Sequence, residues 1–585
     1  MHDSPLNSSD APKQTAWTAA LGRVLAGRWF WMVLLAVCAV AYYGSYYRHS
    51  LNLRDEGGTI VLGAQRLLEG QLPLKDVVLN YNLLWFYPVV GLFKVFGVSY
   101  VLLRAYCFAL STLTVLLAFI AVEKVSRRPW FAFLVALLPL LVPGMTFKNY
   151  MPLLAVSNSL CLLLAALEEE PRRWVRHALL GGCVLGLTFL IRIDLGFFFS
   201  ALWAGFLLLR CFERGLPRKA FQTGAGLLLV AGTALLLHGP VYADARQRGF
   251  DREFVGQYGG WFSYLRTSVR LLSHPSEQGA RPQATAAGAA KTAAVSASRD
   301  VLGRRPVQDI FRGANFQKRC LAFLTYAPPA TLGVLVLWAF LAFIRGIFSR
   351  EPHSTRRPLA ALLMLGGALT TFPQFFFFRP DAPHLSEFAP GYWVGAVCAS
   401  LLLGAHEGSW RSPSRWFGRL ILGFLLVQSA VYLAQMLPDR WTGTIAARKA
   451  RKKLFEAENG VRVFVSTKEQ KGLQGALEVI RAHSKPGEYL VAYPYHPTFN
   501  VLANRPTYER NVYVDNAMRT ANWDAEAIAR FQTHRPAVIV LSDWEVNATP
   551  ASRFSFWAQP TKAWIQENYR YQGTFLDAYE IYTRP

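Results

Sequence analysis

The chain has 585 residues, of which 52% are hydrophobic and only 17% are charged. Long apolar runs recur from about residue 29 to residue 437, which is typical of a polytopic membrane protein and excludes an ordinary soluble fold. The net charge of +25 would suit nucleic-acid binding, but the basic residues fall between apolar runs rather than in one stripe. We therefore expect no nucleic-acid partner. The seven cysteines lie in or beside apolar runs, so no disulfide framework is predicted.

The first 28 residues form a polar segment that we expect in the cytoplasm, and no small-residue cleavage motif follows it. A transmembrane domain is predicted from residue 29 to residue 437. Its predicted membrane-spanning runs are 29–47, 100–122, 130–147, 150–167, 178–191, 195–209, 221–240, 321–344, 359–378, 391–404 and 417–437. Several runs are shorter than the roughly 20 residues that a perpendicular helix needs, so their bounds are approximate.

One further apolar run, 82–97, is short, contains Pro88 and carries Lys94. Lysine and arginine accumulate on cytoplasmic loops, and the basic loops fall on one side only if this run does not cross. These basic loops are 123–129, 168–177, 210–220, 344–358 and 406–419. The pattern predicts about eleven transmembrane helices, with the N-terminus inside and the C-terminus outside. Twelve or thirteen spans remain the alternative.

This topology places several polar segments on the outer face of the membrane. They are 48–98, 147–150, 191–194, 379–388 and the long loop 241–320. After the last span the composition changes, and residues 438–585 are predicted to form a small extracytoplasmic α/β domain. Its expected strands are 461–465, 488–494, 537–543 and 574–582, and its expected helices are 468–483, 523–533 and 559–569.

The acidic pair Asp55 and Glu56 follows the first span directly. A carboxylate at the membrane surface can take a proton from an incoming hydroxyl, which is the work of a general base. The competing interpretation is a helix start, because 60–70 has helical periodicity and acids favour that position. Lys75, Asp76 and Tyr81 follow in the same outer segment. They are candidates for binding a sugar or an acceptor, or are parts of an exposed loop.

Four basic residues on the outer face are candidates for binding a lipid phosphate: Arg192, Arg379, His384 and Lys148. The guanidinium of an arginine forms a fork that fits phosphate oxygens. A structural pair between Arg192 and Asp194 is the alternative. No His, Cys or Asp set has the spacing of a metal site, so a divalent metal is compatible with the chain but unsupported.

The strings RDEGGTIVLGAQRLLEGQLPLKD and NLLWFYPVVGLFKVFGVSYVLLRA, the second ending just past Arg104, carry a resemblance over about residues 29–240. The chain resembles the membrane glycosyltransferases of the GT-C fold and is most similar to the group of the aminoarabinose transferase and the protein O-mannosyltransferases. The resemblance implies a polyprenyl-phosphate-linked sugar donor, a site on the outer face, and Asp55 as catalytic base beside Glu56. The Glu-Lys-Pro string of the aminoarabinose transferase is replaced by LNYNLLW, so a lipid A acceptor is not implied.

These observations predict a hexosyl- or pentosyltransferase in a bacterial inner membrane, acting on an envelope glycan, glycolipid or protein. The alternative is a non-catalytic transporter or scaffold for envelope polysaccharide assembly. A transporter should show internal repeats with broken helices in corresponding halves. The sequence shows no such repeat, and its acids gather in loops, which favours the enzyme.

Overall fold

The protein is described by a computed structural model. The described residues are 27–53, 56–79, 81–143, 146–210, 216–257, 309–312, 316–349, 354–373, 375, 382–404, 412–437, 452–514, 520–545 and 550–585.

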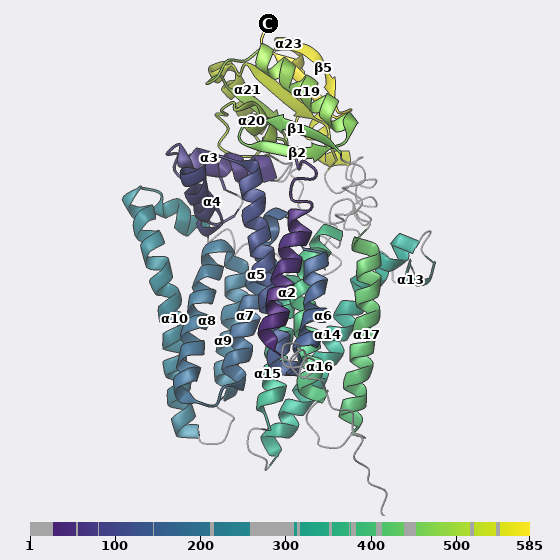
Figure 1. The fold of residues 1–585 in the computed structure, drawn as a ribbon. Helices are drawn as coiled ribbons and strands as arrows, with labels where there is room; N and C mark the ends of the chain where they lie inside the picture. The colour runs from purple at the N-terminus through teal and green to yellow at the C-terminus, as the bar shows by residue number, and fades with distance from the viewer. Residues whose placement is uncertain are drawn as a thin grey trace, which may run out of the picture.

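Long helices run side by side as a bundle (Figure 1). They are α2 (Arg28–Gly44), α5 (Tyr100–Ser126), α6 (Pro129–Leu141), α7 (Tyr150–Leu167), α8 (Pro171–Ile191), α9 (Ile193–Arg210), α10 (Leu216–Gln247), α14 (Phe316–Phe348), α15 (Arg356–Pro373), α16 (Ala382–Gly404) and α17 (Pro413–Met436). Each apolar run expected to cross the membrane coincides with one of these helices. Five of the described helices, α5, α7, α8, α14 and α17, are long and apolar enough to span a bilayer. The number of crossings stays a prediction.

The outer segment after α2 folds into short helices rather than a loop. These are the π-helical η1 (Glu56–Leu62), α3 (Gly63–Leu68) and α4 (Leu83–Phe96), and α3 and α4 lie at one end of the bundle (Figure 1). Asn82 caps α4 by accepting a hydrogen bond from the amide of Leu83, and Gly97 ends it with a φ of +82°. Helix α4 has only 14 residues. It packs on α3 and on the end of α8. This position suits the non-crossing interpretation of 82–97.

The C-terminal region, 452–585, carries two small sheets and lies against the same end of the bundle as α3 (Figure 1). Strands β1 (Lys453–Ala457) and β2 (Val461–Val465) form an antiparallel pair. The second sheet has the order β3-β4-β6-β5, with β3 (Leu490–Tyr493) parallel to β4 (Val538–Ser542) and antiparallel contacts between β4, β6 (Tyr579–Thr583) and β5 (Arg570–Phe575). The helices and short turns of this region are α19 (Thr467–Ala482), α20 (Thr498–Ala503), α21 (Trp523–His534), η6 (Pro550–Ser552), α22 (Phe554–Trp557) and α23 (Gln559–Asn568).

Backbone hydrogen bonds fix this region to the bundle. The amide of Phe464 in β2 donates to the carbonyl of Arg48, and the amide of Ser50 donates back to the carbonyl of Phe464. At the start of α5, the amide of Tyr100 donates to the carbonyl of Asn459. The C-terminal region is therefore joined directly to the segments that flank the acidic pair.

Several expected loops are partly helical, including 210–220, 344–358 and 406–419, where α10, α14, α15 and α17 begin or end. The segment 168–177 is not all loop, because Pro171 occupies the first turn of α8, where its missing amide costs no hydrogen bond. The segment 379–388 is not all loop either, since α16 begins at Ala382. The expected strand 574–582 is a hairpin, in which Leu576 and Asp577 adopt positive φ between β5 and β6.

Candidate functional site

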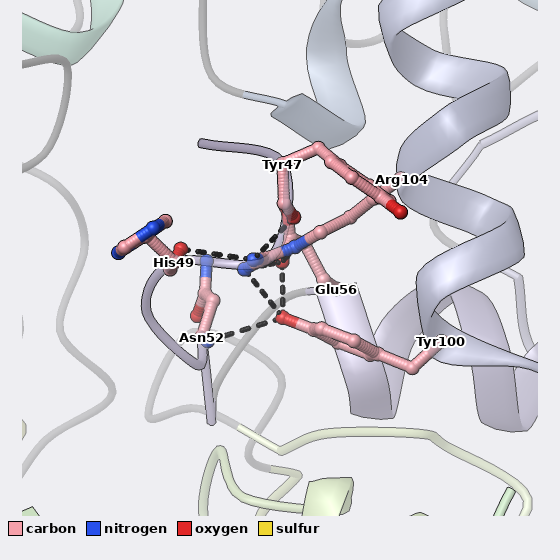
Figure 2. Close-up of polar contacts among 6 residues, drawn as sticks. All are labelled: Tyr47, His49, Asn52, Glu56, Tyr100 and Arg104. Atoms are coloured by element: carbon pink, nitrogen blue, oxygen red, sulfur yellow. Dashed lines mark hydrogen bonds and ion pairs between the residues drawn. The ribbon is translucent and has the colours of Figure 1, made fainter. Parts of the chain in front are cut away.

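Glu56 is buried and ion-paired. Its carboxylate oxygen Oε2 lies 2.7 Å from Nη2 of Arg104 and 3.0 Å from its Nε, while the hydroxyl of Tyr100 donates to the same oxygen (Figure 2). Glu56 is 2% exposed and Arg104 is 4% exposed. Both partners come from α5, where positions four residues apart share one helix face. An oxygen so fully engaged is poorly disposed to accept a substrate proton, so the geometry favours a positioning role for Glu56.

The same guanidinium joins the end of α2 to α5. Nη1 of Arg104 donates to the carbonyls of Tyr47, at 3.1 Å, and His49, at 3.0 Å (Figure 2). The amide of Asn52 donates to the hydroxyl of Tyr100 at 3.2 Å. Removing one partner of such a buried pair typically costs about 3–5 kcal/mol, because the other charge is left uncompensated. The pair therefore fixes the backbone that leads from α2 to the acidic segment.

The two glycines after Glu56 allow the C-terminal region to approach. A Cβ atom on Gly57 would lie 2.5 Å from Cγ2 of Thr498, and one on Gly58 would lie 2.2 Å from Cγ of Pro497. Any larger residue would force η1 and the start of α20 apart. Glycine is required at both positions because η1 and the start of α20 pack so closely.

A second buried cluster combines Lys148, His384 and Glu387. Nζ of Lys148 lies 3.2 Å from Nε2 of His384 and 3.3 Å from Oε1 of Glu387. His384 and Glu387 lie three residues apart in the first turns of α16, so they face the same side. Apart from that ion pair, neither carboxylate oxygen of Glu387 has a hydrogen-bond partner among the described residues.

Arg192 forms a two-pronged pair with Asp194. Its Nε lies 2.7 Å from Oδ1 and its Nη2 lies 3.0 Å from Oδ2, and both side chains are buried. Nη1 lies 3.4 Å from Sδ of Met151, a weak acceptor. The fork that would fit a phosphate is occupied by a carboxylate, which favours the structural interpretation of Arg192.

Tyr150 links these groups to the outer segment. Its ring lies 5.4 Å from that of Tyr81 and 4.4 Å from that of Trp85, centroid to centroid. Three buried charges act on its hydroxyl: Arg192, Glu387 and Asp194. Helix η1 also contacts η2 (Thr146–Lys148), which carries Lys148. We call this collection the end site, defined by Glu56, Tyr100, Arg104, Lys148, Tyr150, Arg192, Asp194, His384 and Glu387.

Two expected site residues are not described, and two lie apart from the end site. Asp55 and Arg379 are outside the described residues. Lys75 and Asp76 are exposed, and Oδ2 of Asp76 accepts a hydrogen bond from the amide of Leu72 at 2.8 Å, as a local turn requires. The structure brings Glu56, Lys148, Arg192 and His384 into the end site, with Tyr81 at its edge. Tyr100 and Tyr150 were missed, since an uncharged aromatic residue in an apolar run gives no signal of a site.

Among the residues that the structure describes, no three His, Cys, Asp or Glu side chains are grouped as metal ligands would be. The end site is instead a set of paired charges.

These features define a multi-pass membrane protein with a polar site at one end of its bundle, beneath a region with two small sheets. The sequence matches no protein-family model and no curated protein.

Solved structures are similar to the chain at low identity. ArnT from Cupriavidus metallidurans in the apo state has 14% identity and a TM-score of 0.46, covering 96% of this chain and 98% of its own. The same protein bound to undecaprenyl phosphate has 13% identity and a TM-score of 0.44, covering 94% and 97%. The arabinofuranosyltransferase AftD from Mycobacteria has 14% identity and a TM-score of 0.41, covering 94% of this chain and 41% of its own. The chain is therefore similar along most of its length to ArnT and to an arabinofuranosyltransferase.

Proposed function

We propose that the protein is an integral membrane glycosyltransferase that moves a sugar from a polyprenyl-phosphate donor to an envelope glycan, glycolipid or protein. The observation that carries this proposal is the Asp55–Glu56 pair after the first span, with Glu56 held by Arg104 of the next long helix. The order of these residues is the one in which the sequence resembles the GT-C enzymes. The contacts of Glu56 give that order a physical reason.

Asp55 acts as the general base. Because Glu56 is committed to Arg104 and Tyr100, its role is to position the segment, and the adjacent carboxylate is left for chemistry. The acceptor hydroxyl oxygen attacks the anomeric carbon, its proton passes to Asp55, and the bond from that carbon to the phosphate oxygen breaks. The leaving group is the polyprenyl phosphate.

Lys148 and His384 hold the phosphate. A lysine ammonium has three donors, and the contacts with His384 and Glu387 use two of them. The third is available for a phosphate oxygen, where a fixed positive charge stabilises the leaving group as negative charge develops. Arg379 remains a further candidate by sequence position, while the pairing of Arg192 with Asp194 makes it the weakest of the four.

The site faces the periplasm of a bacterial inner membrane, with the N-terminus in the cytoplasm. Support comes from the distribution of lysine and arginine between the apolar runs. The end site and the C-terminal region share one end of the bundle, so the same orientation makes the C-terminal region, 438–585 by sequence, periplasmic.

A transporter or scaffold is the second candidate. A transport pathway places ionisable groups near the middle of the membrane, at the junction of repeats. Here the candidate groups gather at helix ends: Arg192 lies between α8 and α9, and Lys148 lies just before α7. This arrangement favours catalysis at a membrane surface.

The test is donor turnover by the purified full chain in lipid nanodiscs. Polyprenyl phosphates carrying radiolabelled hexoses or pentoses would be supplied with envelope extract as acceptor. Release of polyprenyl phosphate together with labelled product supports the enzyme. Unchanged donor with every sugar and extract, from a chain that is correctly inserted, would favour the transporter or scaffold. A deletion strain should accumulate the unused lipid-linked sugar.

A further inference from the structure

An open cleft of about 260 Å³ lies between α3 and the C-terminal region. Its walls come from two parts of the chain that are far apart in sequence: Leu62, Gln65, Arg66, Glu69 and Gln71 on one side, and Pro486, Gly487, Asn504, Arg505, Pro506 and Thr507 on the other. The volume is just below the roughly 300–1,000 Å³ of pockets for drug-sized ligands, so it suits a ligand the size of one sugar ring.

The two arginines of the cleft are already committed within the protein. Arg66 is 5% exposed and donates to Oε1 of Gln71, at 2.7 Å, and to two backbone carbonyls. Arg505 donates to Ser484 and to the carbonyl of Ala503. Burial lowers the pKa of the Arg66 guanidinium, yet both groups remain cations at neutral pH. Because every nitrogen of both guanidinium groups already donates within the protein and Glu69 lies at the rim, the cleft favours a neutral ligand over an anion.

The amides of the cleft are oriented by these contacts. A guanidinium can only donate, so the oxygen of Gln71 must face Arg66 and its NH₂ group must face away. That nitrogen has no hydrogen-bond partner among the described residues. Gln65 donates to Oε1 of Glu69, at 3.0 Å, which in the same way fixes its nitrogen toward the carboxylate. Asn459 donates to Gln65 at 3.4 Å and ties the network to the C-terminal region.

Side-chain amides held in place beside an apolar surface are suited to bind a neutral sugar. Hydroxyl groups are both donors and acceptors, so they can bond the free NH₂ of Gln71 and the carboxylate of Glu69. The C–H face of the ring can pack on Leu62, Pro486 and Pro506. Because these polar groups are held before binding, less rotamer entropy is lost when a ligand arrives.

The cleft lies on the helical segment that leads away from the end site. Leu62 is the last residue of η1, whose first residue is Glu56, and α3 extends the same helical segment. Gln65 lies nine residues after Glu56, which is at most about 13 Å along the axis at the α-helical rise of 1.5 Å per residue. A chain of sugars that lies in the cleft can therefore extend toward the end site.

We propose that this cleft binds a neutral sugar unit of the acceptor, a few residues of glycan away from the hydroxyl that reacts. The acceptor is then a glycan or a glycosylated lipid rather than a bare protein side chain. This inference rests on the proposed function, because only a transferase has an acceptor.

Saturation-transfer NMR on the full chain tests the cleft without turnover. The probes are methyl glycosides of glucose, galactose, mannose and arabinose, and the chain is held in lipid nanodiscs because maltoside detergents carry competing sugars. Glu69→Trp fills the cleft from its exposed rim. Gln71→Glu keeps the contact with Arg66 but replaces the free NH₂ by oxygen. Glu478→Trp, on the exposed face of α19, is the matched control.

We expect saturation transfer from the native chain and from Glu478→Trp to at least one glycoside, weakened roughly tenfold in both cleft variants. Absence of transfer in the native chain, or equal transfer in Glu69→Trp, overturns the cleft. Elution of each variant as a single peak shows that it is folded. If the glycoside binds as expected while the native chain leaves every lipid-linked donor intact, the cleft is a sugar site and the proposed transferase is wrong. If the donor is used and no glycoside binds, the transferase is supported and the cleft is not a sugar site.

Discussion

Gly58 packs so closely on Pro497 of the C-terminal region that a Cβ atom on this glycine would lie 2.2 Å from Cγ of the proline. The residue two positions before Gly58 is Glu56, whose carboxylate is fixed from the other side by Arg104. The acidic segment is thus held between α5 and α20. This contact gives the C-terminal region a role in placing the proposed base.

Gly58→Ala should lower the initial rate of sugar transfer, because overpacking at such a contact costs about 1–3 kcal/mol and moves η1. Adding Pro497→Ala removes Cγ and Cδ, the two nearest atoms that the new methyl group meets, and should restore most of the rate. Gly91→Ala, which meets nothing within 4 Å, is the control and should be silent. A double variant as slow as Gly58→Ala alone would show that the contact does not position the site.

Arg104→Met should destabilise the protein by about 3–5 kcal/mol, since the buried carboxylate of Glu56 would lose its partner. The double variant Arg104→Met with Glu56→Leu should recover much of that loss, because no buried charge remains. Thermal unfolding in nanodiscs measures both. Arg173→Met breaks the exposed pair with Glu170 and should cost at most about 1 kcal/mol. Equal losses from the two arginine variants would contradict the account of the Glu56 pair.

Lys148→Gln should raise the KM for the lipid-linked donor roughly tenfold or more while leaving the KM for the acceptor unchanged, because a charged phosphate contact is lost. Lys148→Arg should retain part of the donor affinity, since the charge is kept. Lys94→Gln, on the exposed face of α4, is the matched control. If both KM values rise together in Lys148→Gln, the residue supports the fold of the site rather than the phosphate.

A cysteine at Val95, whose side chain is 73% exposed on α4, should react with a membrane-impermeant maleimide from the periplasmic side. Arg127→Cys, at the other end of α5, should react only after the membrane is opened. The native cysteines would first be replaced by serine or alanine. Reaction of Arg127→Cys from the periplasmic side, with the cysteine at Val95 reacting only after the membrane is opened, would refute the non-crossing interpretation of α4, and with it the eleven-span topology.

Much of the helical fold could be predicted because apolar run length is a local property. The run 150–167 coincides with α7, and β2 and α19 also lie where periodicity and caps predict them. Ser466 and Glu469 form a capping box that marks the start of α19. Local signals of this kind require no knowledge of the partner segment.

The contacts of the site could not be predicted, because they join distant residues. Glu56 and Arg104 are 48 positions apart, and Lys148 and His384 are 236 apart. His384 was expected in the polar segment 379–388, yet α16 begins at Ala382 and takes in Pro383, since proline is tolerated in the first turn of a helix. The hairpin at Leu576 lacks the glycine or asparagine that usually announces positive φ. In each case a tertiary contact or an uncommon turn residue decided the structure.

Whether Asp55 is the general base is measured by the rate of sugar transfer of Asp55→Asn, compared with Glu478→Gln, which removes an exposed acid on α19. Both variants should insert in the membrane and bind the lipid-linked donor as the native chain does. We expect transfer by Asp55→Asn to fall by roughly a hundredfold or more, because the base is lost, while Glu478→Gln stays near the native rate. Transfer by Asp55→Asn at the native rate would contradict this role of Asp55.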